Sequence, residues 1–319
     1  MVGPASPEAS IASRTNAIAG SLAVPSANSG AASDCQAANC PYNGPVEPPQ
    51  PKTLTTRAAS ESQFYNRYAE QLSVTQLQPQ GVFAPTCLEN VELLDQLGDV
   101  RGQRVLDIGC GQGDTSVAFA LRGAEVWAID VSQQMVELTR QLAAHHGVGD
   151  RVKAEVCPVE AMTYPADFFD LIFADGVLHH LDMNEAVPNL VRVLKPGGRG
   201  FFLEPQKGSI FIRIYRLFAT DLRTADERPL EPGDFEFLQR QFGRLEHREY
   251  HLVSLLLFGA RFVQLKLAGK AFPYWMDDVR QGKCHPRVLR ILQKTDQFLL
   301  GHLPVLRTRC WMTVITVEK

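Results

Sequence analysis

The 319-residue chain lacks a long hydrophobic segment and carries little net charge. It has no run of about eighteen apolar residues, so no transmembrane helix is expected. Its N-terminus has neither the basic start nor the apolar stretch of a signal peptide, which favours a cytoplasmic protein. With a net charge of -3 the chain has no basic excess to attract a polyanion, so we expect no nucleic-acid partner.

Cysteine is sparse as well. The 7 cysteines are odd in number and scattered, so they predict free thiols rather than a disulfide framework. Cys35 and Cys40 lie close together, but a single pair without nearby histidines is a poor zinc site. We therefore expect no metal site.

Aromatic residues are nearly absent from residues 1–52, which are rich in Ala, Ser, Pro, Gly and Asn. A segment of this composition buries too little apolar surface to fold and is predicted to be disordered. Arg14 leaves a transit peptide open as a minor alternative. Residues 53–319 are predicted to form one folded domain, because the chain is 45% apolar and has ample material for a core.

Residues 105–113, VLDIGCGQG, predict a strand that ends in a glycine-rich turn, and residues 114–116 are suited to cap a following helix. The glycines of the turn are Gly109, Gly111 and Gly113. They let the backbone pass close to a ligand, while Asp107 at the strand end can accept hydrogen bonds from a ligand ammonium group. The turn is therefore predicted to bind a nucleoside cofactor.

The spacing of this turn differs from that of a dinucleotide site. The third glycine comes one residue early, and Asp114 stands where a pyrophosphate would approach the helix. Asp130 ends the next strand about twenty residues later, the distance at which a carboxylate binds ribose hydroxyls. A ligand with ribose but without phosphate fits this pattern. S-adenosylmethionine, with its adenine, ribose and amino-acid tail on a sulfonium, is such a ligand.

Four stretches in order, VLDIGCGQG, VWAID, FDLIFADGVLHHL and LKPGGRGFFLEP, resemble the motifs of class I S-adenosylmethionine-dependent methyltransferases of the UbiE-like small-molecule type. The resemblance runs from about Phe64 to Pro205. It implies a Rossmann-like α/β fold, with a mostly parallel seven-stranded sheet and helices on both faces. It also implies an enzyme that uses S-adenosylmethionine as cofactor.

The alternation of apolar stretches and helical patterns independently predicts a parallel sheet with its ligand at the carboxyl ends of the strands. Expected strands are residues 125–129, 152–156, 169–174, 199–204 and 309–319, and expected helices are 88–97, 114–122, 132–146 and 184–194. LKPGG before residue 199 is interpreted as a helix stop followed by a turn.

The resemblance also implies a set of cofactor-binding positions. These are Tyr65, Asp107, Gly109, Cys110, Gly111, Gly113, Asp130, Val131, Val159, Glu160 and Asp175. Tyr65 lies on a helix expected to cover the cofactor, and a role in packing alone is an equal alternative. Pro158 departs from the family pattern, which has an acid for the adenine amino group at this position. Either Glu160 substitutes for that acid, or backbone groups and apolar contacts hold the adenine.

His179 and His180 are the candidate catalytic residues. They follow a strand end in the stretch from which, in the resembled family, donor and acceptor are reached, and a neutral imidazole can take a proton from an acceptor hydroxyl. The alternative is that both are packed or hydrogen-bonded residues at the start of a helix. His145 and His146 end a helix and are interpreted as structural.

Two insertions, at about residues 206–231 and 254–305, are predicted to form a helical cap over the acceptor. The second could instead form a dimer face or a membrane-surface contact, and a monomer and a homodimer both remain open. Apolar and aromatic residues are expected to line the pocket, namely Phe211, Ile214, Phe258, Phe262, Phe272, Tyr274 and Trp275.

The resulting hypothesis is methyl transfer to a small, largely hydrophobic or aromatic metabolite. One alternative is a catalytically silent, methyltransferase-like binding subunit, which Pro158 keeps open and the intact glycines with Asp107 and Asp130 oppose. Another is a methyltransferase that acts on protein or nucleic acid. In the amino-methylating enzymes of that kind an N/D-P-P-Y motif follows the fourth strand, and here that place reads ADGV.

Overall fold

The computed structural model describes residues 55–83, 88–209, 228–267 and 286–319. The chain divides into two units, Met1–Glu47 and Pro48–Lys319. All the described residues belong to the second unit.

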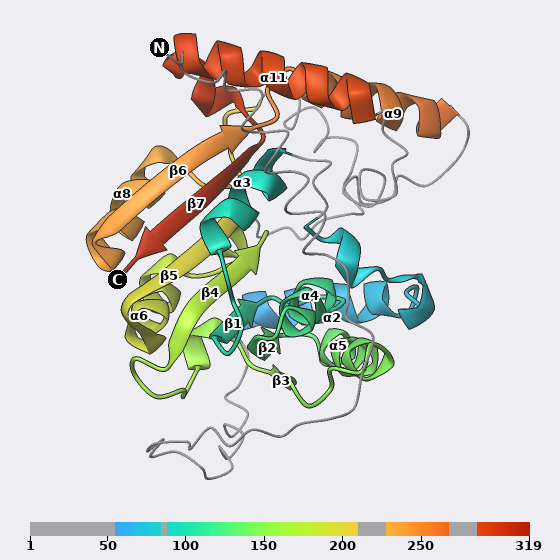
Figure 1. The fold of residues 1–319 in the computed structure, drawn as a ribbon, viewed down its shortest axis with the longest axis vertical. Helices are drawn as coiled ribbons and strands as arrows, with labels where there is room; N and C mark the ends of the chain where they lie inside the picture. The colour runs from blue at the N-terminus through green and yellow to red at the C-terminus, as the bar shows by residue number, and fades with distance from the viewer. Residues whose placement is uncertain (1–54, 84–87, 210–227, 268–285) are drawn as a thin grey trace, which may run out of the picture. The chain divides into compact units, whose positions relative to one another are not determined.

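In the described part of the chain, seven strands form one sheet in the order β3-β2-β1-β4-β5-β7-β6 (Figure 1). Their bounds are β1 Arg104–Ile108, β2 Glu125–Asp130, β3 Val152–Val156, β4 Phe169–Asp175, β5 Leu194–Pro205, β6 Arg244–Tyr250 and β7 Met312–Glu318. Strands β1 to β5 pair in parallel, and β7 runs antiparallel between β5 and β6. The predicted mostly parallel seven-stranded sheet is therefore confirmed.

Helices connect the strands, as the alternation in the sequence predicts. They are α2 Thr56–Ala69, α3 Leu88–Leu97, α4 Asp114–Leu121, α5 Gln133–His145, α6 Met183–Val193, α8 Pro232–Phe242, α9 Leu255–Leu267 and α11 Pro286–His302. Short 3₁₀ turns are η1 Val74–Gln76, η2 Pro79–Gly81, η3 Val159–Ala161, η4 Leu178–His180 and η6 Pro304–Arg309. Ser132 caps α5 by accepting a hydrogen bond from the backbone of Met135, as its position before the helix predicts.

The sheet has an apolar core on each face. Alternate residues of β5 point to opposite faces, so Phe201 joins one core while Phe202 joins the other. The core that contains Phe201 also takes residues of α3, α4 and α5, and the core that contains Phe202 takes residues of α6 and α8. Both faces of the sheet carry apolar side chains, so helices must cover both faces to keep these side chains out of water.

Three local expectations need correction or stay open. LKPGG is part of β5, where Leu194 pairs with Phe169 before a shift in register, so the predicted turn is wrong. The last strand begins later than expected, because residues 304–309 form η6. Of the predicted cap insertion at about residues 206–231, residues 210–227 lie outside the described residues. Between β6 and β7 the described residues form α9 and α11, and none of the described helices is long and apolar enough to cross a membrane.

The buried Asp296 of α11 joins these last two helices. Its carboxylate accepts hydrogen bonds from the backbone N–H groups of Leu252 and Val253 and from the hydroxyl of Ser254, just before α9 begins. A carboxylate at this end of a helix satisfies N–H groups that have no partner within the helix.

Candidate active site

The glycine turn between β1 and α4 depends on its glycines for two different reasons. Gly109, Gly111 and Gly113 all have positive φ, at 63, 51 and 88 degrees. A Cβ at Gly113 would lie 2.7 Å from Cα of Thr139, and one at Gly109 would lie 2.5 Å from a methyl carbon of Val177. At Gly111 a Cβ would meet only the carbonyl oxygen of Gly109, at an ordinary contact distance of 3.9 Å, so only its backbone conformation requires glycine there.

Asp130, at the carboxyl end of β2, fastens this turn to the next loop. One carboxylate oxygen accepts the backbone N–H of Gly111 at 3.0 Å, and the other accepts that of Ser132 at 2.8 Å. Burial raises the pKa of Asp130, and the charge of the Glu61 carboxylate adds to this. Each oxygen retains a lone pair for a further donor such as a ligand hydroxyl.

Asp107, at the carboxyl end of β1, is almost fully buried. Its carboxylate accepts a hydrogen bond from the hydroxyl of Ser116 at 2.5 Å. Burial raises its pKa to about 7, and the charges of Asp175 and Asp130 contribute. The expectation that residues 114–116 cap α4 is therefore wrong, because Gly113 is the N-cap residue and Ser116 serves Asp107 instead.

The glycine turn, Asp107 and Asp130 together form what we call the cradle. The charge of the cradle indicates which kind of ligand it can bind. Among the described residues, neither Asp107 nor Asp130 forms an ion pair with a lysine or arginine, although both are buried. Buried carboxylates without a cation are costly. A ligand that carries positive charge and hydroxyl groups can bind to these carboxylate acceptors, and a phosphate cannot.

The loop after β4 is shaped by Glu204, a fully buried residue of β5. One oxygen accepts the backbone N–H groups of Val177 and Leu178 at 2.9 and 2.7 Å, and the other lies 2.7 Å from Nδ1 of His179. Glu204 is not among the predicted cofactor-binding or catalytic residues. The signal that could have identified it is an acid inside the otherwise apolar stretch FFLEP.

Besides Glu204, residues of helix α2 also bind the loop after β4. The buried carboxylate of Glu61 lies 2.9 Å from Nδ1 of His180. Arg57, one turn earlier on α2, donates to the carbonyl oxygens of His179 at 2.8 Å and Leu181 at 3.4 Å. The two imidazole rings lie next to each other, with centroids 4.1 Å apart. Both candidate catalytic histidines thus have a carboxylate partner.

Helix α2 also contacts the loop after β2. The side-chain oxygen of Asn66 accepts a hydrogen bond from the hydroxyl of Ser132 at 2.6 Å. Tyr65 packs against the small apolar cluster of Ala69, Met135 and Leu138. This is the packing alternative for Tyr65, and its contact with a cofactor stays a prediction.

The remaining cofactor positions of the sequence analysis differ in surroundings. Cys110 is buried, and burial raises its pKa well above the usual range, so its thiol stays protonated. Val159 is buried in η3, which places an apolar side chain after β3. Glu160 accepts the backbone N–H of Asp182 at 3.3 Å, so its carboxylate is directed toward the start of α6. Val131 directly follows Asp130, and Asp175 ends β4.

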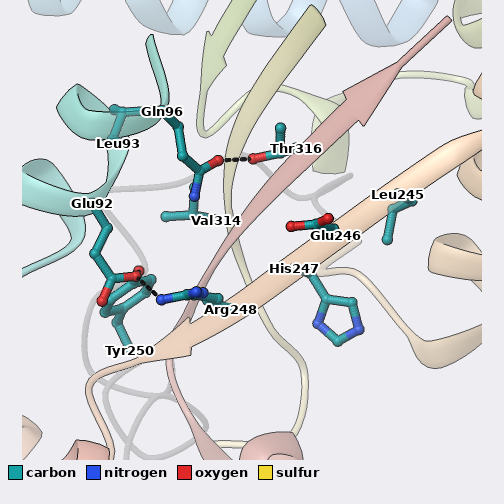
Figure 2. A pocket seen from close by; sticks show the side chains of 10 residues that line it. All are labelled: Glu92, Leu93, Gln96, Leu245, Glu246, His247, Arg248, Tyr250, Val314 and Thr316. Carbon is teal, nitrogen blue, oxygen red and sulfur yellow. Dashed lines mark hydrogen bonds and ion pairs between the residues drawn. The ribbon is translucent and has the colours of Figure 1, made fainter. Parts of the chain in front are cut away.

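A pocket of about 330 Å³ lies elsewhere, between α3 and strands β6 and β7. Two pairs of its polar side chains bind each other: Glu92 with Arg248 at 2.8 Å, and Gln96 with Thr316 at 2.6 Å (Figure 2). None of the predicted site residues lines it. Most of the predicted acceptor walls, namely Phe211, Ile214, Phe272, Tyr274 and Trp275, lie outside the described residues.

Strand order 3-2-1-4-5-7-6 with an antiparallel β7, a glycine turn after β1 and an acid after β2 together define the Rossmann-like fold of class I methyltransferases. Residues 105–198 match the model of a protein family described as "Methyltransferase domain". Residues 105–198 therefore resemble a methyltransferase domain, and the described part of the chain has the Rossmann-like fold of class I S-adenosylmethionine-dependent methyltransferases.

Two curated relatives are similar to the central part of the chain. The chain is 34% identical over 123 residues to "Ubiquinone/menaquinone biosynthesis C-methyltransferase UbiE" of Geobacter sulfurreducens, covering 37% of this chain and 48% of the relative. It is 36% identical over 132 residues to "Ubiquinone biosynthesis O-methyltransferase" of Bordetella avium, covering 39% of this chain and 53% of the relative. The chain thus spans about half the length of these curated relatives.

The solved structure of geranyl diphosphate C-methyltransferase from Streptomyces coelicolor A3(2), in complex with Mg²⁺, geranyl diphosphate and S-adenosyl-L-homocysteine, has the same fold. Its TM-score is 0.54 at 13% identity, and the match covers 84% of this chain and 99% of that one. Among the described residues of our chain, no group of three His, Cys, Asp or Glu side chains is arranged to hold a metal ion.

Proposed function

We propose that this chain transfers a methyl group from S-adenosylmethionine to a small, largely hydrophobic or aromatic metabolite. The observation that carries the proposal is the pair of buried carboxylates, Asp107 and Asp130, which lack a lysine or arginine ion pair among the described residues. The cofactor brings positive charge on its ammonium and sulfonium groups, and so compensates for buried negative charge. When bound, it supplies a methyl group on a positively charged sulfur.

In this proposal different residues of the cradle bind different parts of the cofactor. Asp107 binds the ammonium group, Asp130 binds the ribose hydroxyls, and the backbone of Gly109 to Gly113 lies against the amino-acid tail. Val131 and Val159 give the adenine apolar contact, and Glu160 and Asp175 complete the wall. His179 and His180 stand where an acceptor proton can be removed, while the surrounding helices exclude water and align the acceptor.

The acceptor class rests on two supports. The names of the curated relatives include a C-methyltransferase of ubiquinone and menaquinone biosynthesis and an O-methyltransferase of ubiquinone biosynthesis. In this chain, Phe258 is buried beside Trp311, which gives the region after β6 an apolar, aromatic character. An aromatic metabolite with a polar group to methylate fits such walls.

Calorimetric titration with S-adenosylmethionine tests the first half of the proposal. Incubation with a panel of hydrophobic phenols and reduced quinones, followed by mass spectrometry, tests the second half. Transfer appears as a product heavier than its acceptor by one CH₂ group. Binding without transfer to any member of the panel would favour the silent binding subunit, and absence of binding would overturn the proposal.

A further inference from the structure

We infer that Glu61 of helix α2 is a positioning residue for His180, and that His180 is the base that takes a proton from a phenolic acceptor. This inference rests on the proposed function. It distinguishes between two adjacent histidines that sequence alone leaves equivalent.

The two histidine–carboxylate pairs differ in what their carboxylates do. Glu204 is fully buried in β5 and, besides His179, binds the backbone N–H groups of Val177 and Leu178. A carboxylate with these partners holds the loop in shape. Arg57 and the backbone N–H of Arg228 also bind the carbonyl oxygen of His179. The His179 pair is therefore explained by the architecture of the loop.

Glu61 is placed differently, because it comes from the covering helix and not from the sheet. Its carboxylate lies 2.9 Å from Nδ1 of His180, and its charge is among the groups that raise the pKa of Asp130 after burial. The same helix also binds the loop after β2, because the side-chain oxygen of Asn66 accepts a hydrogen bond from the hydroxyl of Ser132 at 2.6 Å. The pair of Glu61 and His180 therefore belongs to an element that contacts both the loop after β4 and the loop after β2.

A carboxylate at Nδ1 determines which nitrogen can act. An ionised carboxylate only accepts, so Nδ1 of His180 carries the proton and Nε2 carries the lone pair. Among the residues that the structure describes, Nε2 of His180 has no hydrogen-bond partner. The carboxylate also stabilises the imidazolium that forms when Nε2 accepts a proton.

The reaction balances with these groups alone. The hydroxyl proton of the phenol moves to Nε2 of His180, and an electron pair of the resulting phenolate forms the bond to the methyl carbon, at oxygen or at a ring carbon. The methyl–sulfur bond breaks, and its electrons stay on sulfur in neutral S-adenosylhomocysteine. The imidazolium then releases its proton to water. After attack at carbon, the ring proton also goes to water and the oxygen takes a proton back, so the aromatic phenol is restored and one proton is released overall in either case.

The first arm of the test needs no acceptor. With S-adenosylhomocysteine present, nitrogen NMR of the wild-type protein should show His180 protonated at Nδ1, and Glu61→Gln should remove this preference. Glu70→Gln, an exposed carboxylate at the end of the same helix, is the matched control and should change nothing. A wild-type His180 protonated at Nε2 would overturn the inference, whatever the acceptor is.

The second arm compares two phenols that differ in acidity. At pH 8, 4-ethylphenol is still neutral and needs a base, whereas 4-nitrophenol is largely ionised and needs none. For Glu61→Gln we expect kcat on 4-ethylphenol to fall by about tenfold to a hundredfold, part of the effect of a general base. On 4-nitrophenol it should change by less than about twofold, with KM for both unchanged, and Glu61→Asp should restore part of the loss.

The outcomes separate the two proposals. Equal loss on both phenols means that Glu61 only holds the structure together, and no loss on either means that it has no role; each result overturns the inference while the proposed function stands. A wild-type protein that binds S-adenosylmethionine but methylates neither phenol overturns the phenolic acceptor. In that case the NMR arm alone decides whether Glu61 orients His180.

Discussion

The affinity for S-adenosylmethionine should rise with pH through about 7, because the carboxyl of Asp107 must lose its proton to bind an ammonium group. Near pH 7 the carboxyl of Asp107 is protonated in about half of the molecules of the free protein, so binding should release about half a proton per molecule. Well below this pH the dissociation constant should increase by about tenfold for each pH unit.

The same pKa predicts the opposite trend for the stability of the ligand-free protein. Burial raises the pKa of Asp107 from 3.8 to about 7, which corresponds to about 4 kcal/mol against the buried charged form. Between these pH values the folded chain binds more protons than the unfolded chain. The contribution of Asp107 to the free energy of unfolding therefore falls as pH rises through this window, and is regained on acidification.

Asp107→Asn separates the two effects, because Asn keeps an acceptor for Ser116 but removes the charge. At pH 8 the variant should melt at a higher temperature than the wild type and bind S-adenosylmethionine at least tenfold more weakly. A charge-assisted hydrogen bond is worth about 1.5–3 kcal/mol, which supports that loss. Calorimetry in two buffers of different ionisation enthalpy counts the protons released, and exposed Asp150→Asn is the control. Proton release near zero together with an affinity independent of pH would refute the reasoning.

Three further predictions concern other parts of the chain. Asp130→Ala should lower cofactor affinity by at least tenfold, measured by calorimetry, and unchanged binding by a folded variant would contradict its placement. Gly113→Ala should lower the unfolding free energy by about 2 kcal/mol more than Gly147→Ala, because both have positive φ but only Gly113 is crowded; equal losses would contradict this. Deleting residues 1–50 should leave the melting temperature and cofactor binding nearly unchanged, because a segment of that composition buries little; a large drop would mean that it docks on the domain.

The residues of the predicted cofactor site could be recognised in the sequence because their signals are local. A strand, a glycine turn and an acid follow one another within residues 104–114, and Asp130 ends the next strand. Parallel strands with their carboxyl ends at one edge then bring Asp107 and Asp130 together without further information.

The partners of the histidines were not predictable in this way. His180 is 119 residues from Glu61, and His179 is 25 residues from Glu204. Nothing in the helical pattern of residues 61–73 distinguishes Glu61 from a solvent-exposed acid, because its burial depends on how α2 lies against the loop. The capping expectation failed for a related reason. Gly113 takes the N-cap position through its left-handed φ, which leaves Ser116 to bind a carboxylate nine residues earlier.

Because helix α2 contacts both predicted cofactor loops, we expect cofactor binding and the orientation of the proposed base to depend on each other. Asn66 binds the loop after β2, while Arg57 and Glu61 bind the loop after β4, so one rigid element contacts both sides of the cradle. A substitution that unseats α2 should therefore weaken cofactor affinity and turnover together. Glu61→Gln keeps the shape of the side chain and removes only its charge, so a loss of turnover with unchanged cofactor affinity would separate orientation of His180 from the seating of the helix.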